Sequence, residues 1–416
     1  MGGQRDFVLM NLRETITMAP LAEAGRFTRV TSQDLGPVAD SWIAVSGDKI
    51  AAVGTGAIDP KFQSYPTTDC AGGIALPGLI DSHTHPVFAG IRANEFCMRL
   101  DGKTYHEIAA AGGGIQSSVT NTKNATDSDL LELLRERLRV FASHGVTTVE
   151  MKSGYGLTVD EELRHLRLIR TESARSAQTV YATCLALHAV PRNQSSAKVW
   201  ADTCARDLLP KVKAENLADA VDAFIENGYF SVSDCENYFQ TAKSLGLATR
   251  LHADEFSDAG GAECAARFNA QSADHLQFAS AQGIRAMSAA GVVATLLPGT
   301  SLYTSIPYTD SRPFKDADCP VALATDFNPG SCPVDNLRLV LTMGALHCKL
   351  TMAEALAAVT WVAARALRLE SSKGALTAGR DADILVMPLG GAEEFVADLG
   401  RTKPRAVYAR GSLIFS

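Results

Sequence analysis

One recurrence constrains the fold of this chain more than any other feature: an apolar run, a loop and an amphipathic helical stretch follow one another eight times. The predicted strands span residues 74–79, 147–151, 179–187, 220–225, 248–252, 272–276, 292–297 and 321–325. Predicted helices between them include 127–144, 160–173 and 259–269. Eight strand–helix units of this kind close into a parallel barrel. We therefore predict an α/β protein built on a (β/α)8 TIM-like barrel.

The two ends of the chain have a different pattern, with short β-rich runs at 42–45, 49–53, 382–387 and 406–414. The 416 residues exceed the ~250 of a typical barrel and leave room for a second module. Neither end is long enough to bury a sheet of its own. We predict that residues 1–75 and 374–416 together form a small composite β-sandwich beside a barrel of residues 76–373. A helical region at 352–369 is expected to close that barrel.

Composition and charge exclude several classes of partner. The formal net charge of −7 argues against a general affinity for nucleic-acid phosphates. No run approaches the ~18 consecutive apolar residues of a membrane helix, and the N-terminus lacks the pattern of a signal peptide. The nine cysteines are scattered without a Cys-x-x-Cys pair, which favours buried free thiols in a reducing compartment. We therefore expect a cytoplasmic protein that binds neither nucleic acid nor membrane.

Two histidines follow the first predicted strand, in the sequence LPGLIDSHTH at 76–85. His83 and His85 lie on the same face if the segment is extended, and neutral imidazoles are common ligands of divalent metals. The apolar run before them places both at the C-terminal mouth of the barrel, where active sites of this fold lie. A bare His-x-His is more often a pair of polar loop residues. The lead-in sequence and the later partners favour a metal site here.

Three further motifs supply those partners. His252 ends the fifth predicted strand, and Glu255 follows it by three residues, within reach of a water on a metal. His275 lies at the end of the sixth strand, and Asp326 follows the eighth. Each residue alone would be an ordinary hydrogen-bonded group, but the ordered set suits metal-assisted hydrolysis. We predict one catalytic metal held by His83, His85, His252 and Asp326.

These motifs resemble the amidohydrolase superfamily, and most closely its ring-opening enzymes of histidine degradation. The specific stretches are HTHPVFAGIR at 83–92, AGGGI at 111–115, EMKSGYGL at 150–157 and ATDFNPGS at 324–331. The resemblance covers nearly the whole chain. It implies a barrel with a composite β-sandwich, one iron or zinc ion, and hydrolysis of 4-imidazolone-5-propanoate to N-formimidoyl-L-glutamate.

The fourth predicted strand bears on the number of metal ions. Many binuclear relatives bridge two metals with a carboxylated lysine at the end of this strand, and residues 220–226 contain no lysine. Lys152 follows the second strand, so we expect it either to be solvated or to support the ligands from behind. One metal ion is therefore favoured. Imidazole and carboxylate ligands suit both iron and zinc, so the choice between them stays open.

The substrate implied by the resemblance carries a carboxylate and a planar ring. Arg92 is a candidate to bind the carboxylate through its planar guanidinium, and Tyr105 to add a hydroxyl donor. The alternative for both is an ordinary surface position. Tyr155 is a candidate to contact the ring or the carboxylate, and His188 ends the third strand at the same mouth. The resemblance adds polar contacts from three residues beyond the metal aspartate: Asn328, Gly330 and Ser331.

Three side chains are candidates for the chemistry itself. We expect Glu255 to transfer protons and His275 to orient water or polarise the carbonyl oxygen. Asp326 is both a ligand and a candidate base, and the sequence does not divide the proton transfers among the three. The expected partner is a small molecule with a carboxylate. The oligomeric state stays open, although the resemblance suggests a homodimer.

Two other functions are compatible with part of this pattern. A nucleobase aminohydrolase, such as a cytosine or guanine deaminase, shares the series of metal ligands but needs no group that binds a carboxylate. Arg92, Tyr105 and Tyr155 argue against it. A non-catalytic binding protein of the same fold usually loses metal ligands, whereas this chain retains the full set together with Glu255.

Overall fold

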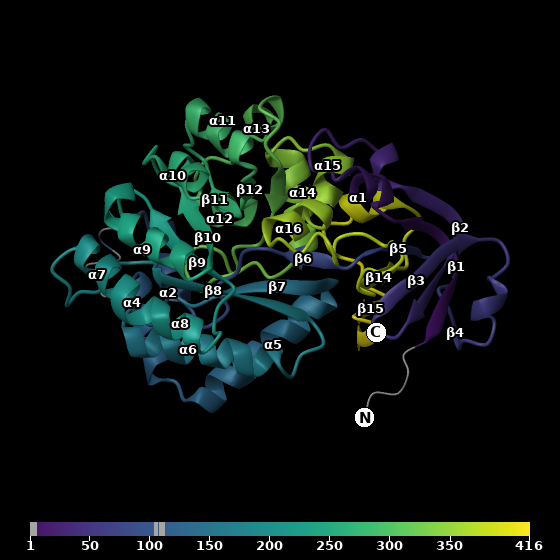
Figure 1. Cartoon of the computed structure of the whole chain (residues 1–416), viewed down its shortest axis with the longest axis horizontal. Coiled ribbons are helices and arrows are strands. Elements are labelled where there is room, and N and C mark those ends of the chain that lie inside the picture. The colour runs from purple at the N-terminus through teal and green to yellow at the C-terminus, as the bar shows by residue number, and fades with distance from the viewer. Residues whose placement is uncertain (1–5, 104–106, 108–112) are drawn as a thin grey trace.

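The computed structural model describes residues 6–103, 107 and 113–416. Its larger part is a sheet of eight parallel strands, from β6 to β13, in which each strand pairs with the next in the chain (Figure 1). The strands are β6 (Leu79–Asp81), β7 (Val146–Lys152), β8 (Thr179–Leu187), β9 (Ala220–Ile225), β10 (Ala248–Ala253), β11 (Ser272–His275), β12 (Val293–Leu296) and β13 (Val321–Leu323). The predicted α/β barrel is confirmed.

The barrel closes through the residues that follow its first and last strands. Thr84 and Phe327 form a parallel bridge. The Asp326 N–H donates to the His83 carbonyl at 3.0 Å, and the His85 N–H donates to the Phe327 carbonyl at 2.9 Å. Because these closing segments carry the His-x-His pair and the aspartate, closure itself brings the predicted metal ligands together from distant parts of the sequence.

Helices cover the outside of the barrel (Figure 1). They include α2 (Ala93–Leu100), α4 (Ile115–Asn124), α5 (Asp127–Ser143), α6 (Val159–Ser173), α7 (Ala197–Thr203), α8 (Leu209–Ala214), α9 (Val232–Ser244), α10 (Gly261–Arg267), α11 (Ala281–Ala290), α12 (Pro298–Thr304), α13 (Arg312–Asp316), α14 (Leu337–His347), α15 (Met352–Ala358) and α16 (Trp361–Ala366). α5 begins at a capping box formed by Thr126 and Asp129, which satisfies backbone N–H groups that a helix start leaves free. The predicted helical region 352–369 is divided into α15 and α16 at Thr360, whose φ of −130° and ψ of −92° are not helical.

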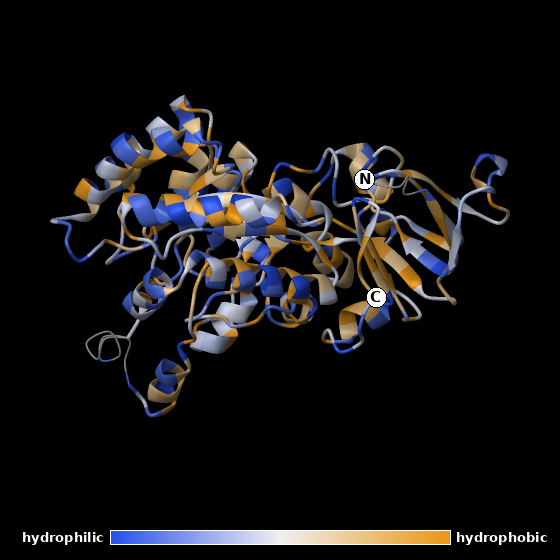
Figure 2. Cartoon of the chain, turned by 90° about the horizontal axis from the view of Figure 1, so that it is seen from below, coloured by the Kyte–Doolittle hydropathy of each residue, from blue (hydrophilic) through white to orange (hydrophobic). Residues whose placement is uncertain are grey.

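Both ends of the chain build a second, mixed sheet. Its strands are β1 (Phe7–Ile16), β2 (Pro37–Ser46), β3 (Lys49–Thr55), β4 (Thr67–Asp69), β5 (Ile74–Pro77), β14 (Ile384–Met387), β15 (Ala406–Ala409) and β16 (Ser412–Phe415). The order β16-β15-β14-β5-β1-β2-β3, with β4 also on β1, joins the two ends. Figure 1 shows these purple and yellow strands beside the barrel, and Figure 2 shows hydrophobic residues along them. Leu9, Ile43 and Ile384 belong to a core of their own, and the predicted composite β-sandwich is confirmed.

One predicted strand is divided between the two sheets. Residues 74–77 form β5, which pairs with β14, and Leu79 begins β6, which pairs with β7. Between them, a Cβ on Gly78 would lie 2.3 Å from the Thr147 hydroxyl, so the close passage between the sheets requires glycine. The apolar run could not reveal this division, because both halves are buried. The domain boundaries at 75/76 and 373/374 stay a prediction.

The structure also bears on the cysteines and on membrane contact. Eight of the nine cysteines are buried, and Cys97 is the exposed one. Within the described ranges, no helix combines the length and apolar character needed to cross a bilayer. The cytoplasmic location stays a prediction.

Candidate metal centre and active site

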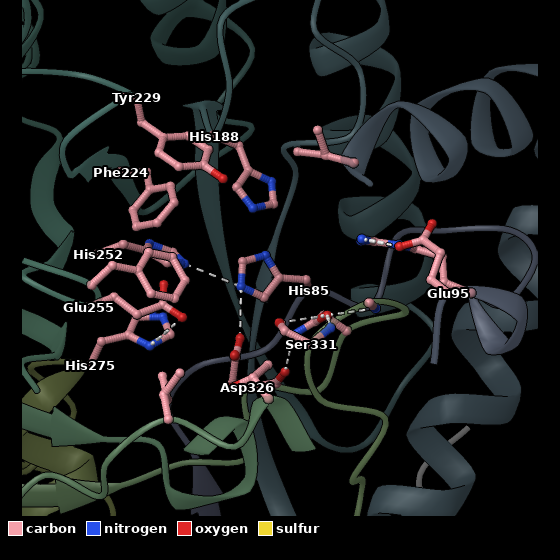
Figure 3. Close-up of a pocket in the computed structure, with 18 of the residues that line it drawn as sticks. His85, Glu95, His188, Phe224, Tyr229, His252, Glu255, His275, Asp326 and Ser331 are labelled. Atoms are coloured by element: carbon pink, nitrogen blue, oxygen red, sulfur yellow. Dashed lines mark hydrogen bonds and ion pairs between the residues drawn. The ribbon is translucent and has the colours of Figure 1, made fainter. Parts of the chain in front are cut away.

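The predicted metal ligands meet at the C-terminal mouth of the barrel. His83 and His85 follow β6, His252 lies in β10, and Asp326 follows β13. The Nε2 atom of His85 lies 3.1 Å from that of His83 and 3.3 Å from that of His252. The Oδ1 atom of Asp326 lies 3.1 Å from His85 Nε2 and 3.4 Å from His83 Nε2. Figure 3 shows His85 between His252 and Asp326, so the ligand atoms converge on one region.

The hydrogen bonds of these histidines show that the cluster fits a cation. Asp274 Oδ2 lies 2.6 Å from His83 Nδ1, and Asp222 Oδ1 lies 3.1 Å from His252 Nδ1. With each carboxylate accepting a hydrogen bond from the Nδ1–H group, both Nε2 atoms present lone pairs to the centre. Lone pairs this close together repel one another unless a cation lies among them. Ligand atoms around tetrahedral zinc, with bonds of ~2.0–2.1 Å, are about 3.3–3.4 Å apart, which matches the cluster.

Three residues at this mouth have a left-handed backbone. The φ angle is +79° at His275, +56° at Asp326 and +52° at Asp254, directly before Glu255. Non-glycine residues in this region are strained, and such strain is concentrated at functional sites. Some of the strained backbone of the chain therefore lies where the strands end and the candidate catalytic side chains begin.

Glu255 and His275 lie beside the cluster. Glu255 Oε1 is 3.6 Å from His275 Nδ1, and both side chains are buried. Burial, reinforced by the charge of Asp326, raises the pKa of Glu255 well above its ordinary value, and burial lowers the pKa of His275 to about 4. A ring nitrogen of His275 also lies within 4.8 Å of those of His83 and His252, so it is a further candidate ligand. A buried carboxyl group beside a neutral imidazole is an arrangement suited to general acid–base catalysis.

The cluster opens into a cavity of about 650 Å³. Its wall includes most of the predicted site residues: His85, Arg92, Tyr155, His188, His252, Glu255, His275, Asp326, Asn328, Gly330 and Ser331. Figure 3 shows Glu95 and Ser331 across the cavity from Glu255 and His275. His83 is fully buried. Tyr105 lies outside the described residues.

Arg92 is held by a residue that the sequence reasoning missed. Glu95 Oε2 accepts hydrogen bonds from Arg92 Nε at 2.9 Å and Nη2 at 2.7 Å, and Glu95 Oε1 accepts one from the Gly114 N–H at 2.9 Å. A Cβ on Gly330 would lie 1.9 Å from Arg92 Nη1, so only glycine admits the guanidinium there. The Nε and Nη2 edge of the Arg92 guanidinium is therefore held by Glu95 at the cavity wall. The i,i+3 spacing of Arg92 and Glu95 was the signal available in the sequence.

Asn328 shapes the loop that follows Asp326, a predicted metal ligand. Its Oδ1 accepts from the N–H groups of Gly330 at 2.8 Å and Ser331 at 2.7 Å, and its Nδ2 donates to the Asp326 carbonyl at 2.7 Å. These bonds place the loop at the cavity wall. The contacts of the three loop residues with a substrate stay a prediction, as do those of Tyr155 and of the other residues on the wall.

Behind the histidines lies a layer of buried charged residues, and only Lys152 among its members was considered from the sequence. Its members are fully buried: Glu150, Lys152, Asp222, Arg250 and Asp274. Of the two alternatives for Lys152, solvation is wrong, because its Nζ contacts Glu150 and Asp222. The available signal was a charged residue inside an apolar strand, as Asp222 is in β9.

The barrel and its cluster define a metal-dependent hydrolase, and comparison with known proteins narrows this class. A profile of the amidohydrolase family matches residues 111–415. An imidazolonepropionase from Erwinia tasmaniensis is 45% identical over 374 residues, which cover 89% of this chain and 92% of that protein. Another, from Paracidovorax citrulli, is 41% identical over 379 residues, or 90% and 91% of the two chains.

Solved structures agree with the fold. An adenosine deaminase from Xanthomonas campestris, crystallised with bound zinc, has a TM-score of 0.71 at 16% identity, over 98% of this chain and 92% of that chain. At this identity the likeness extends to the fold alone. With the sequence comparisons, it leads to one conclusion: the chain belongs to the amidohydrolase family, and within that family to the imidazolonepropionases.

Proposed function

We propose that this chain hydrolyses 4-imidazolone-5-propanoate to N-formimidoyl-L-glutamate. The observation that carries the proposal is a single cavity with two chemically different sides. One side holds the histidine–aspartate cluster with Glu255 and His275, and the other holds the Arg92 guanidinium. A ligand with a cyclic amide at one end and a carboxylate at the other matches both sides. The imidazolonepropionase relatives support the same substrate.

The residues that would hold the metal are His83, His85, His252 and Asp326, and the ion is zinc or iron. A divalent cation bound there supplies Lewis acidity, which activates water and polarises a carbonyl group. Thr300 supports the cluster, because its hydroxyl donates to Asp326 Oδ2 at 2.5 Å and leaves Oδ1 directed at the histidines. The narrow spacing of the ligand atoms supports one ion for each chain.

In the reaction, water adds to the ring carbonyl carbon, the bond from that carbon to the ring nitrogen breaks, and the nitrogen takes up a proton. Glu255 accepts a proton from the attacking water and returns it to the leaving nitrogen. His275, neutral because burial lowers its pKa to about 4, orients the water or the carbonyl oxygen. Arg92 binds the propanoate carboxylate and sets the distance from that carboxylate to the reacting carbon.

Turnover of freshly generated imidazolone propionate tests this function, followed by the loss of the ring's ultraviolet absorbance. We expect ring opening without release of ammonia. Ammonia release from cytosine or guanine, with no activity on the imidazolone, would instead make the chain a nucleobase aminohydrolase.

The number of metal ions gives a separate prediction. The ligand atoms of His83, His85 and Asp326 lie within 4.8 Å of one another, and β9 carries no lysine that could bridge a second ion. We expect close to one tightly bound metal ion per chain by elemental analysis of the purified protein. Two tightly bound ions per chain would exclude a mononuclear centre.

Arg92→Met is expected to raise KM more than it lowers kcat. The guanidinium lies across the cavity from the reacting groups, so its loss removes binding that is common to the ground state and the transition state. Because it is enclosed and held by Glu95, its bond to a carboxylate should exceed the small value of an exposed pair. An unchanged KM would assign the carboxylate to another residue. Arg99→Met, a change of another arginine on the cavity wall, is the matched control.

A further inference from the structure

Buried cations and carboxylates form a connected layer behind the metal-binding histidines. Lys152 Nζ lies 2.8 Å from Glu150 Oε1 and 2.9 Å from Asp222 Oδ2. Arg250 Nη2 lies 3.3 Å from Asp274 Oδ2, and its Nε lies 3.9 Å from Glu150 Oε1. Isolated buried charges are costly, so these groups are tolerated because they are paired with one another. Burial by itself would lower the pKa of Lys152, but the negative charges of Asp222 and Glu150 have the larger combined effect. The pKa of Lys152 is therefore raised, and the lysine stays protonated.

Lys152 reaches the ligand His252 through Asp222. Lys152 binds the Oδ2 of Asp222, and the Oδ1 accepts from the backbone N–H of His252 at 3.1 Å. The Nδ1 of His252 lies 3.1 Å from both carboxylate oxygens. The ammonium group thereby restricts rotation of the carboxylate. The carboxylate in turn orients the imidazole ring and directs its Nε2 lone pair into the cluster.

Lys152 reaches His83 and His85 through Glu150. While Oε1 of Glu150 binds the ammonium group, its Oε2 accepts from the Thr84 N–H at 3.1 Å. Thr84 lies between the two histidines, and its hydroxyl donates to the Glu150 carbonyl at 2.5 Å. The Lys152 N–H also donates to the Thr84 carbonyl at 3.1 Å. One ammonium group is thus connected to ligands that come from two different strands.

We propose that Lys152 is a positioning residue for the metal centre: by joining Asp222 to Glu150, it holds three ligand histidines at the spacing that a divalent cation requires. It touches neither the ligand atoms nor the cavity. With Lys152 included, the layer contains two cations and three carboxylates, so its net charge is one negative charge. That negative charge balances the positive charge that a divalent cation retains beside the Asp326 carboxylate. The proposal rests on the metal site of the proposed function.

The chain offers a matched control for this role. Lys373 is also buried between two carboxylates, with its Nζ 2.9 Å from Asp381 Oδ2 and 2.7 Å from Asp383 Oδ2. Through Asp383, Lys373 is connected to the Thr147 hydroxyl at the start of β7, the end of that strand opposite to Lys152. The Lys→Met change at either position removes the same charge from the same kind of environment. The pair therefore separates a general loss of stability from a loss of metal positioning.

The experiment measures zinc affinity by competition with a chromophoric chelator, the visible spectrum of the cobalt(II) form, and unfolding of the metal-free protein in urea. For Lys152→Met we expect zinc affinity to fall by about 10–100-fold, as for other partners of metal ligands, and the cobalt spectrum to change. For Lys373→Met we expect a lower urea midpoint with unchanged zinc affinity and spectrum. Lys152→Gln keeps hydrogen-bond donors without the charge and should lose affinity in the same direction.

Lys152→Gln keeps the test decisive if Lys152→Met does not fold. Wild-type zinc affinity and an unchanged cobalt spectrum in a folded Lys152 variant would overturn the positioning role. An equal loss of affinity in Lys373→Met would also overturn it, because the effect would then follow from stability alone. If the unaltered chain binds no zinc or cobalt, the metal site of the proposed function fails first, so the two failures are distinguishable.

Discussion

Replacing Glu255 with Gln is expected to lower kcat by about 10²–10⁴-fold while metal content and fold stay intact. Glutamine keeps the size and hydrogen-bonding capacity of the side chain but cannot accept a proton. Glu255 lines the cavity with its Oε1 3.6 Å from His275 Nδ1, so its carboxyl group is placed to exchange protons with a ligand in the cavity. Turnover, elemental analysis and circular dichroism on one preparation would test this.

Glu263→Gln is the matched control, because Glu263 lies on α10 and its carboxylate accepts from the Ser280 hydroxyl at 2.6 Å. It should leave kcat unchanged. Near wild-type turnover in Glu255→Gln would contradict the proton-transfer role of Glu255 and would assign that role to His275 or Asp326. Loss of metal in that variant would make Glu255 a ligand.

His252→Ala is expected to lose metal and activity together. The change removes an Nε2 atom that lies 3.3 Å from the Nε2 of His85. It also removes the Nδ1–H group that donates a hydrogen bond to Asp222. Mutation of a residue that only orients a ligand typically lowers metal affinity by about 10–100-fold, so loss of the ligand itself should lower it by more than about 100-fold. Chelator competition and turnover, measured with and without added metal, give both values.

His188→Ala separates this effect from a general disturbance of the cavity. The His188 ring stacks on that of His85 with centroids 5.1 Å apart, and its Nδ1 lies 3.1 Å from the Gly154 carbonyl, outside the ligand cluster. This variant should retain its metal and change KM. Wild-type metal affinity in His252→Ala would show that the remaining residues suffice and that the ligand set is different.

The barrel could be predicted because its elements are specified locally. The predicted strands 179–187 and 220–225 coincide with β8 and β9, since apolar β-forming runs between turns need no distant partner to be recognised. The run 74–79 was different. Its first four residues pair with β14, more than 300 residues later, and its last residue, Leu79, pairs with β7. The choice between sheets therefore depends on strands that the run itself does not reveal.

The convergence of the predicted metal ligands could be foreseen for a related reason. In a parallel barrel all strands end at the same mouth, so a histidine or aspartate at several strand ends implies that these side chains meet. Glu95, Asp222 and Asp274 do not follow from that rule. Their roles depend on which group each carboxylate faces, and the Asp222 partner Lys152 lies 70 residues away.

The sequence by itself therefore determined the barrel and predicted which side chains gather at its mouth, because periodicity and strand order are local signals combined by one topological rule. Only the tertiary structure decided that Lys152 is buried, that Arg92 is held by Glu95, and that a charged layer supports the histidines. The physical reason is that desolvation and Coulomb interactions depend on neighbours in space, and a charged residue is buried only where folding supplies its counter-charge.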